Sequence, residues 1–205
     1  MCVCRCLHFF AKQLIDQLNQ LAIHDSLTGL YQRHFLIDSI PNILKRKKRA
    51  EKRLLAIVFM YIDRFKRVND RYGHAVGDNL LSRVARTVPD DSRPSDPSIR
   101  NGGGEFVVVG LFASEAAILR YAERLGSITS TLVFNESDEA FSITQSVGIS
   151  LYQDGGEAFE EALQRADAFL YQAKEADRPF TPICIFRPEN DKYPRSSVGI
   201  APELG

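Results

Sequence analysis

The stretch YIDRFKRVNDRYGHAVGDNLL, from Tyr61 to Leu81, carries most of the information about the fold. The apolar run Leu54–Ile62 leads into it, and a run that is short and uninterrupted is typical of a buried strand. Helical patterns follow over residues 64–72 and 78–88. Backbone N–H groups at a strand-to-helix turn, with Lys66 close by, are suited to bind phosphate. The stretch therefore predicts a buried strand that opens into a polar, anion-binding turn.

Helices and strands are mixed along the rest of the chain. We expect helices at 11–23, 32–53, 114–126 and 157–176, with Pro41 as a kink or boundary in the second. We expect strands at 141–151 and 182–186, a hairpin at 100–110 that turns at Gly102-Gly103-Gly104, and a polar loop at 89–97. Because no regular βαβ alternation is visible, the pattern predicts an α/β (α+β) fold with helices packed on a mixed sheet.

The composition narrows the classes of partner. The 205 residues fit one compact domain, and 26 Lys and Arg balance 26 Asp and Glu. A net charge of zero argues against a general nucleic-acid or anionic-membrane binder, so the basic run Lys45–Arg53 is interpreted as a solvated helix end. The longest apolar run, Leu54–Ile62, is less than half of the ~20 residues that a membrane span needs. We expect no nucleic-acid partner and no membrane span in this chain.

The cysteines indicate a reducing compartment. Cys2, Cys4 and Cys6 alternate near the N-terminus, whereas closed zinc sites usually contain pairs separated by two to four residues. The apolar segment Leu7–Ala11 is too short for the core of a signal peptide. We therefore expect a cytoplasmic protein.

Five motifs follow one another along the chain: DSLTGL (25–30), Tyr61–Asp78, GGGEF (102–106), SVGI (146–149) and ADAFLYQAK (166–174). In this order they resemble the motifs of the GGDEF domain, the catalytic module of bacterial diguanylate cyclases. The resemblance implies a palm-like fold with a mixed, mostly antiparallel sheet flanked by helices. It also divides the chain into a leader and connector helix (1–23), a degenerate GGDEF domain (24–187) and a flexible C-terminal tail (188–205).

The resemblance implies an activity and also a defect in it. Family members condense two GTP molecules into cyclic di-GMP with the help of divalent metal ions, which neutralise phosphate charge and activate the attacking hydroxyl. The two metal-binding acids of the family correspond here to Tyr61 and Gly104, and neither offers the hard oxygen ligands that Mg²⁺ needs. Glu105 is the catalytic carboxylate that remains, and Asp63 is a substitute ligand if the strand continues that far. We expect no cofactor, and Mg²⁺ only if cyclase activity survives.

The nucleotide contacts implied by the resemblance are better preserved. Asn69 and Asp78 suit guanine, since a carboxylate accepts hydrogen bonds from its N–H groups and an amide serves either role. The full set of expected GTP contacts is Lys66, Asn69, Asp78, Lys174 and Arg178.

A second ligand site is implied by an R-x-x-D motif. Arg93 and Asp96 form it, and residues 97–101 separate it from Gly102, as in the inhibitory site that binds cyclic di-GMP in the family. Arginine can donate two hydrogen bonds to guanine O6 and N7, and aspartate can accept from N1–H and N2–H. Arg124 on the following helix is a further candidate.

Three functions remain open on this basis. The favoured hypothesis is a non-catalytic signalling module that binds cyclic di-GMP through Arg93 and Asp96 and acts on a downstream protein partner. An active or residually active diguanylate cyclase is the second, with GTP as its ligand. A non-binding structural pseudo-enzyme that forms a homodimer through helix 11–23 is the third.

Overall fold

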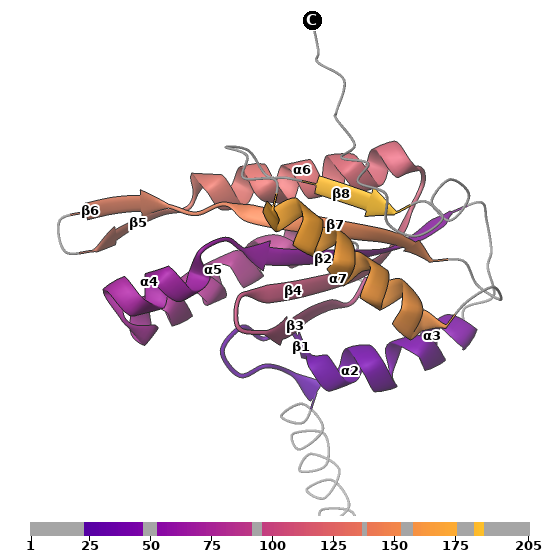
Figure 1. The fold of residues 1–205 in the computed structure, drawn as a ribbon. Coiled ribbons are helices and arrows are strands. Elements are labelled where there is room, and N and C mark those ends of the chain that lie inside the picture. Colours follow the sequence, from indigo (N-terminus) through magenta and orange to yellow (C-terminus); the bar gives the residue numbers. More distant parts are fainter. Residues whose placement is uncertain are drawn as a thin grey trace, which may run out of the picture.

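A six-stranded mixed sheet forms the centre of the molecule (Figure 1). The structure, a computed structural model, describes residues 23–46, 53–91, 96–136, 139–152, 158–175 and 183–186. The strands, in sheet order, are β1 (Tyr31–Gln32), β3 (Ser98–Gly102), β4 (Glu105–Phe112), β2 (Leu54–Ile62), β7 (Gln145–Tyr152) and β8 (Ile183–Phe186). The pairs β1–β3 and β7–β8 are parallel and the three others are antiparallel, which confirms the predicted mixed, mostly antiparallel sheet.

Helices cover both faces of this sheet (Figure 1). One face packs against α2 (Arg33–Asp38), α3 (Ile40–Arg46) and α7 (Phe159–Glu175). The other packs against α4 (Phe65–Tyr72), α5 (His74–Asp91) and α6 (Glu115–Thr131). The apolar residues of β2 alternate between these two cores, and a strand buried on both faces needs the uninterrupted apolar run that its sequence has. None of the helices in the described ranges is long and apolar enough to cross a membrane.

Helix α7 packs unusually close to strand β7, at Gly148. A Cβ atom on Gly148 would overlap the backbone of Ala166 and Leu170. Glycine at this position therefore lets the helix rest directly on the strand. This close approach positions the face of α7 that carries Asp167 and Lys174.

Some predicted boundaries are wrong. The helix expected at 32–53 does break near Pro41, as predicted, but at Ser39. Pro41 lies in the first turn of α3, where its missing N–H has no intrahelical role. Residues 89–91, expected in a loop, complete α5 because buried Leu80, Val84 and Val88 continue its apolar face. Residues 1–22 of the expected leader (1–23) and the tail 188–205 lie outside the described residues.

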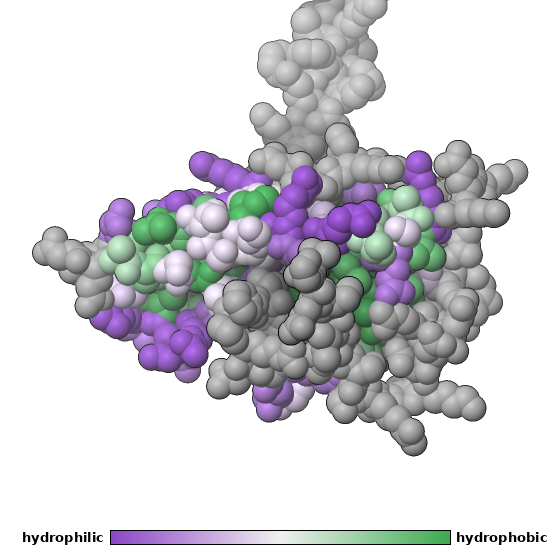
Figure 2. Space-filling view, turned by 90° about the horizontal axis from the view of Figure 1, so that it is seen from above, coloured by the Kyte–Doolittle hydropathy of each residue, from purple (hydrophilic) through white to green (hydrophobic). Residues whose placement is uncertain are grey.

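A two-stranded hairpin was not predicted from the sequence. It consists of β5 (Val133–Glu136) and β6 (Glu139–Ser142), so the single strand expected at 141–151 is divided between β6 and β7. The hairpin extends beyond the main sheet, near one end of α6 (Figure 1). Seen from above, the surface of the molecule shows apolar residues interspersed with hydrophilic ones (Figure 2). Val133 of β5 is 49% exposed.

Candidate functional site

Tyr61 lies where three elements meet at one end of the sheet. In the strand register it stands between Glu105 of β4 and Ser146 of β7. Nζ of Lys174, from α7, lies 3.4 Å from the centroid of the Tyr61 ring, which is a cation–π contact. Burial, and after it the carboxylates of Glu105 and Asp63, raises the pKa of the Tyr61 phenol above its usual value of 10.0. The phenol is therefore neutral at physiological pH.

Gly104 is buried in the turn between β3 and β4. Its carbonyl accepts a 3.0 Å hydrogen bond from the N–H of Ile62, which joins the turn to the end of β2. A Cβ atom at this position would lie 3.2 Å from Cβ and Cγ of Phe65, closer than ordinary van der Waals contact. The position thus has little room for a side chain unless Phe65 shifts.

Asp63 directly follows β2 and lies on the same side of the sheet as Tyr61, because it bonds to Ser146, the residue opposite Tyr61 in the register. Its two carboxylate oxygens accept hydrogen bonds from the Thr144 hydroxyl (2.7 Å) and the Ser146 hydroxyl (2.8 Å). Its backbone N–H donates to the Thr144 carbonyl at 2.9 Å. Asp63 consequently connects the end of β2 to β7.

Two carboxylates remain near Tyr61. Glu105 accepts a 2.8 Å hydrogen bond from the side-chain amide of Asn101. Asp167 was not singled out from the sequence, although it precedes Lys174 by two helical turns in the matched helix motif. Burial, followed by the Glu105 charge, raises the pKa of Asp167, while Lys174 and Arg33 oppose that change. Nowhere in the described ranges do three or more His, Cys, Asp or Glu side chains form a group that could hold a metal ion.

The expected guanine contacts lie on α4 and α5. The turn into α4 passes through Arg64, whose φ of 56° is left-handed and uncommon for a residue with a Cβ. Lys66 and Asp78 are exposed and Asn69 is half-buried. Gly77 of α5 is buried against Asn69, and a Cβ atom there would overlap the Asn69 side-chain oxygen. Because Gly77 has no side chain, the Asn69 amide can occupy this space.

Replacement of Gly77 by alanine therefore tests the role of Asn69. The resemblance implies that Asn69 contacts the guanine of GTP. The new methyl group displaces the flexible end of the Asn69 side chain, so on that basis we expect about tenfold weaker GTP binding and a nearly unchanged melting temperature. Calorimetric titration with GTP measures the loss. The double variant Asn69→Ala with Gly77→Ala should bind no more weakly than Asn69→Ala alone, because both changes act on one amide. Additive losses would contradict this interpretation.

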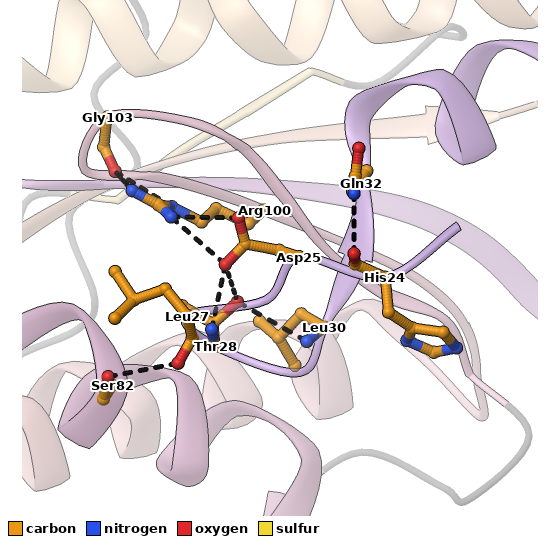
Figure 3. Close-up of polar contacts among 9 residues, drawn as sticks. All are labelled: His24, Asp25, Leu27, Thr28, Leu30, Gln32, Ser82, Arg100 and Gly103. Carbon is orange, nitrogen blue, oxygen red and sulfur yellow. Dashed lines mark hydrogen bonds and ion pairs between the residues drawn. The ribbon is translucent and has the colours of Figure 1, made fainter. Parts of the chain in front are cut away.

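The DSLTGL motif is joined to the β3–β4 turn by an ion pair (Figure 3). Nη1 of Arg100 lies 3.1 Å and 3.0 Å from the two carboxylate oxygens of Asp25, and Arg100 also donates to the Gly103 carbonyl at 3.3–3.4 Å. Asp25 further accepts hydrogen bonds from the backbone and hydroxyl of Thr28. The turn that contains Gly104 is therefore fixed from two sides.

Two residues of the expected cyclic di-GMP site are within the described ranges. Asp96 is half-buried, and a Cβ atom on Gly110 would lie 3.1 Å from its carboxylate. Arg124 is exposed on α6, one turn beyond Tyr121, whose ring lies 5.5 Å from that of Phe112. Since Gly110 and Phe112 point to the same face of β4, Asp96 and α6 lie on the same side of the sheet. Arg93 and the expected GTP contact Arg178 lie outside the described residues.

Comparison with known proteins agrees with the fold. The family model "Diguanylate cyclase, GGDEF domain" matches residues 22–179. The chain is 38% identical over 162 residues to the bifunctional diguanylate cyclase/cyclic di-GMP phosphodiesterase MucR of Pseudomonas aeruginosa. That match covers 79% of this chain but only 23% of the length of MucR.

Solved structures show the same fold. The diguanylate cyclase SiaD of P. aeruginosa, solved with its activator SiaC, has a TM-score of 0.72 and 30% identity, over 89% of this chain and 70% of SiaD. The GGDEF domain of DgcB from Caulobacter crescentus, solved with cyclic di-GMP, has a TM-score of 0.72 and 25% identity, over 80% of this chain and 95% of that domain. The strand arrangement, the ordered motifs and these matches agree, and the chain belongs to the GGDEF family of diguanylate cyclase domains.

Proposed function

We propose that this chain is a catalytically degenerate GGDEF domain that binds cyclic di-GMP through its R-x-x-D motif and passes the signal to a downstream protein. The observation that carries the proposal is the replacement of two metal-binding acids beside an R-x-x-D motif with the spacing of the family's inhibitory site. Condensation of GTP would need those acids to hold the metal ions that neutralise phosphate charge, whereas recognition of guanine by arginine and aspartate does not.

The geometry around Tyr61 supports the loss of catalysis. A neutral phenol with Lys174 over its ring stands at one metal position, and Gly104, tightly packed on Phe65, stands at the other. Asp63 and Glu105 both accept hydrogen bonds from neighbouring side chains. Mg²⁺ requires hard oxygen ligands in near-octahedral geometry, so these residues do not fit the ion.

The placement of Asp96 supports ligand binding at the second site. Its half-buried carboxylate lies on the side of the sheet that α6 covers, and α6 carries the exposed Arg124. The DgcB domain, which was solved with cyclic di-GMP, supports the choice of ligand.

The test is calorimetric titration of the full chain with cyclic di-GMP. Arg93→Ala removes a donor pair to guanine, so we expect at least about tenfold weaker binding than for the wild type. Arg86→Ala, at an exposed position on α5, is the matched control and should bind as the wild type does.

Equal heats for the wild type and Arg93→Ala, or no heat from either, would overturn the proposal. Incubation of the wild type with GTP and Mg²⁺ or Mn²⁺ should give no cyclic di-GMP on chromatography. Formation of the product would show that catalysis persists and would favour the cyclase.

A further inference from the structure

Gly110 interrupts the apolar sequence of β4 at a buried position. Glycine in the interior of a strand weakens it, because the unfolded chain gains freedom and no side chain packs. It often marks a place where another group approaches the backbone closely. Its neighbours Val109 and Leu111 are both apolar, so the sequence pattern alone gives no reason for a glycine. The reason lies in what surrounds Gly110 in the fold.

Asp96 is the group that approaches this glycine. The pairing of β3 with β4 continues past Ser98, because the N–H of Val109 donates a 3.2 Å hydrogen bond to the Pro97 carbonyl. Asp96 therefore stands opposite Gly110. A Cβ atom on Gly110 would lie 3.1 Å from Oδ2 of Asp96, closer than ordinary van der Waals contact. The carboxylate thus lies across the backbone of β4, in the space that a side chain at position 110 would fill.

An aromatic ring shares this space. The same Cβ atom would lie 3.0 Å from Cε2 of Phe112, whose ring is 5.5 Å from that of Tyr121 on α6. Tyr121 is buried and Phe112 is half-buried, so the Phe112 ring has little freedom to turn away. The Asp96 carboxylate and the Phe112 ring consequently meet over Gly110, on the side of the sheet that α6 covers.

We propose that Gly110 is a positioning residue for guanine recognition: because it has no side chain, Asp96 can hold its carboxylate where it accepts hydrogen bonds from N1–H and N2–H of the base. This role rests on the proposed function, in which Arg93 and Asp96 bind cyclic di-GMP. Arginine recognises O6 and N7, which hypoxanthine shares with guanine, whereas the N2–H group belongs to guanine alone. Asp96, and through it Gly110, therefore determines the preference for guanine over hypoxanthine.

The test compares two ligands in calorimetric titrations of the full chain: cyclic di-GMP and its inosine analogue, which lacks the 2-amino group. The wild type is expected to bind cyclic di-GMP about tenfold more tightly than the analogue. Gly110→Val fills the space of the carboxylate, so it should weaken binding of cyclic di-GMP about tenfold and leave the two ligands within about twofold of each other. Arg93→Ala should weaken both ligands alike, because both carry O6 and N7.

Two further variants show that the glycine acts through the carboxylate. In an Asp96→Ala background, Gly110→Val should cause no further loss of affinity, because both changes remove the same group. Gly110→Ala adds a single methyl group that shifts the carboxylate less, and it should weaken cyclic di-GMP about threefold. The alanine variant replaces the valine variant in every comparison if the latter does not fold.

A Gly110 variant that keeps the wild-type preference for guanine, or that weakens both ligands equally, would overturn this role, because the glycine would then serve the fold alone. Those results leave the proposed function intact as long as Arg93→Ala binds cyclic di-GMP more weakly than the wild type does. If the wild type binds neither ligand, the proposed function fails, and the role of Gly110 fails with it.

Discussion

Gly148→Val is expected to unfold the domain or leave it barely stable. A Cβ atom at Gly148 would overlap the carbonyl of Ala166 and the backbone N and Cα of Leu170, so α7 as a whole would have to move away from the sheet. Overpacking that displaces backbone costs at least ~3 kcal/mol, a large part of the ~5–15 kcal/mol that stabilises a typical domain. The melting temperature followed by circular dichroism should fall by at least ~6 °C.

Ser150→Ala is the matched control for this prediction. Ser150 lies two residues further along β7, on the same face, and is fully buried. Its hydroxyl has no hydrogen-bond partner in the described part of the chain, so its removal should change stability by less than ~1 kcal/mol. If the valine variant yields no protein, Gly148→Ala provides the same contact in a milder form. If Gly148→Val or Gly148→Ala is as stable as Ser150→Ala, α7 is not held against β7 at this point.

The elements predicted best are those whose own sequence determines their environment. Leu54–Ile62 was predicted and observed as a strand with the same ends, because both faces of β2 pack against a core and the run of apolar residues is unbroken from end to end. The helix expected at 157–176 is observed as Phe159–Glu175, since its apolar face has a clear helical period. In both, the local pattern and the tertiary contacts favour the same structure.

The β5–β6 hairpin shows why local patterns were not sufficient. Phe141 of β6 stacks on Tyr72 of α4, with 4.7 Å between ring centroids, and on Phe134 of β5 at 5.3 Å. The guanidinium of Arg83 in α5 lies 4.3 Å from the Phe134 ring, and Arg83 donates to the Val133 carbonyl at 2.8 Å. The hairpin is stabilised by residues far away in sequence, and no pattern within 133–142 contains them.

The same limit applies to the site. Motif order identified the positions of Tyr61, Gly104 and Lys174, but not that Lys174 would lie on the ring of Tyr61. Asn101 and Asp167 were missed because their importance comes from a neighbour, Glu105, that only the folded chain brings close. A motif gives the residue types of a site, whereas the state of each group depends on contacts between elements.

The ion pair between Asp25 and Arg100 should make stability depend on pH in a predictable direction. Burial alone would raise the pKa of Asp25, but hydrogen bonds from Thr28 and Arg100 and the Arg100 charge outweigh it and lower the pKa. A carboxyl whose folded pKa lies below its unfolded value of ~3.9 stabilises the fold above that pH. This stabilisation is lost as the pH falls through the folded pKa. Acid should therefore weaken the connection between the DSLTGL segment and the β3–β4 turn.

Arg100→Met tests whether the ion pair between Asp25 and Arg100 causes this dependence of stability on pH. The side chains of Arg100 and Asp25 are only 17% and 22% exposed, so loss of the arginine leaves a mostly buried carboxylate without its counterion. We expect the free energy of unfolding in urea to fall by about 2 kcal/mol at pH 7. At pH 3 the difference from the wild type should be smaller, because protonation of Asp25 weakens the pair in the wild type as well. Asp25→Asn combined with Arg100→Met gives the coupling energy. A difference between Arg100→Met and the wild type that is the same at both pH values would mean that packing of the arginine, and not its charge, stabilises the turn.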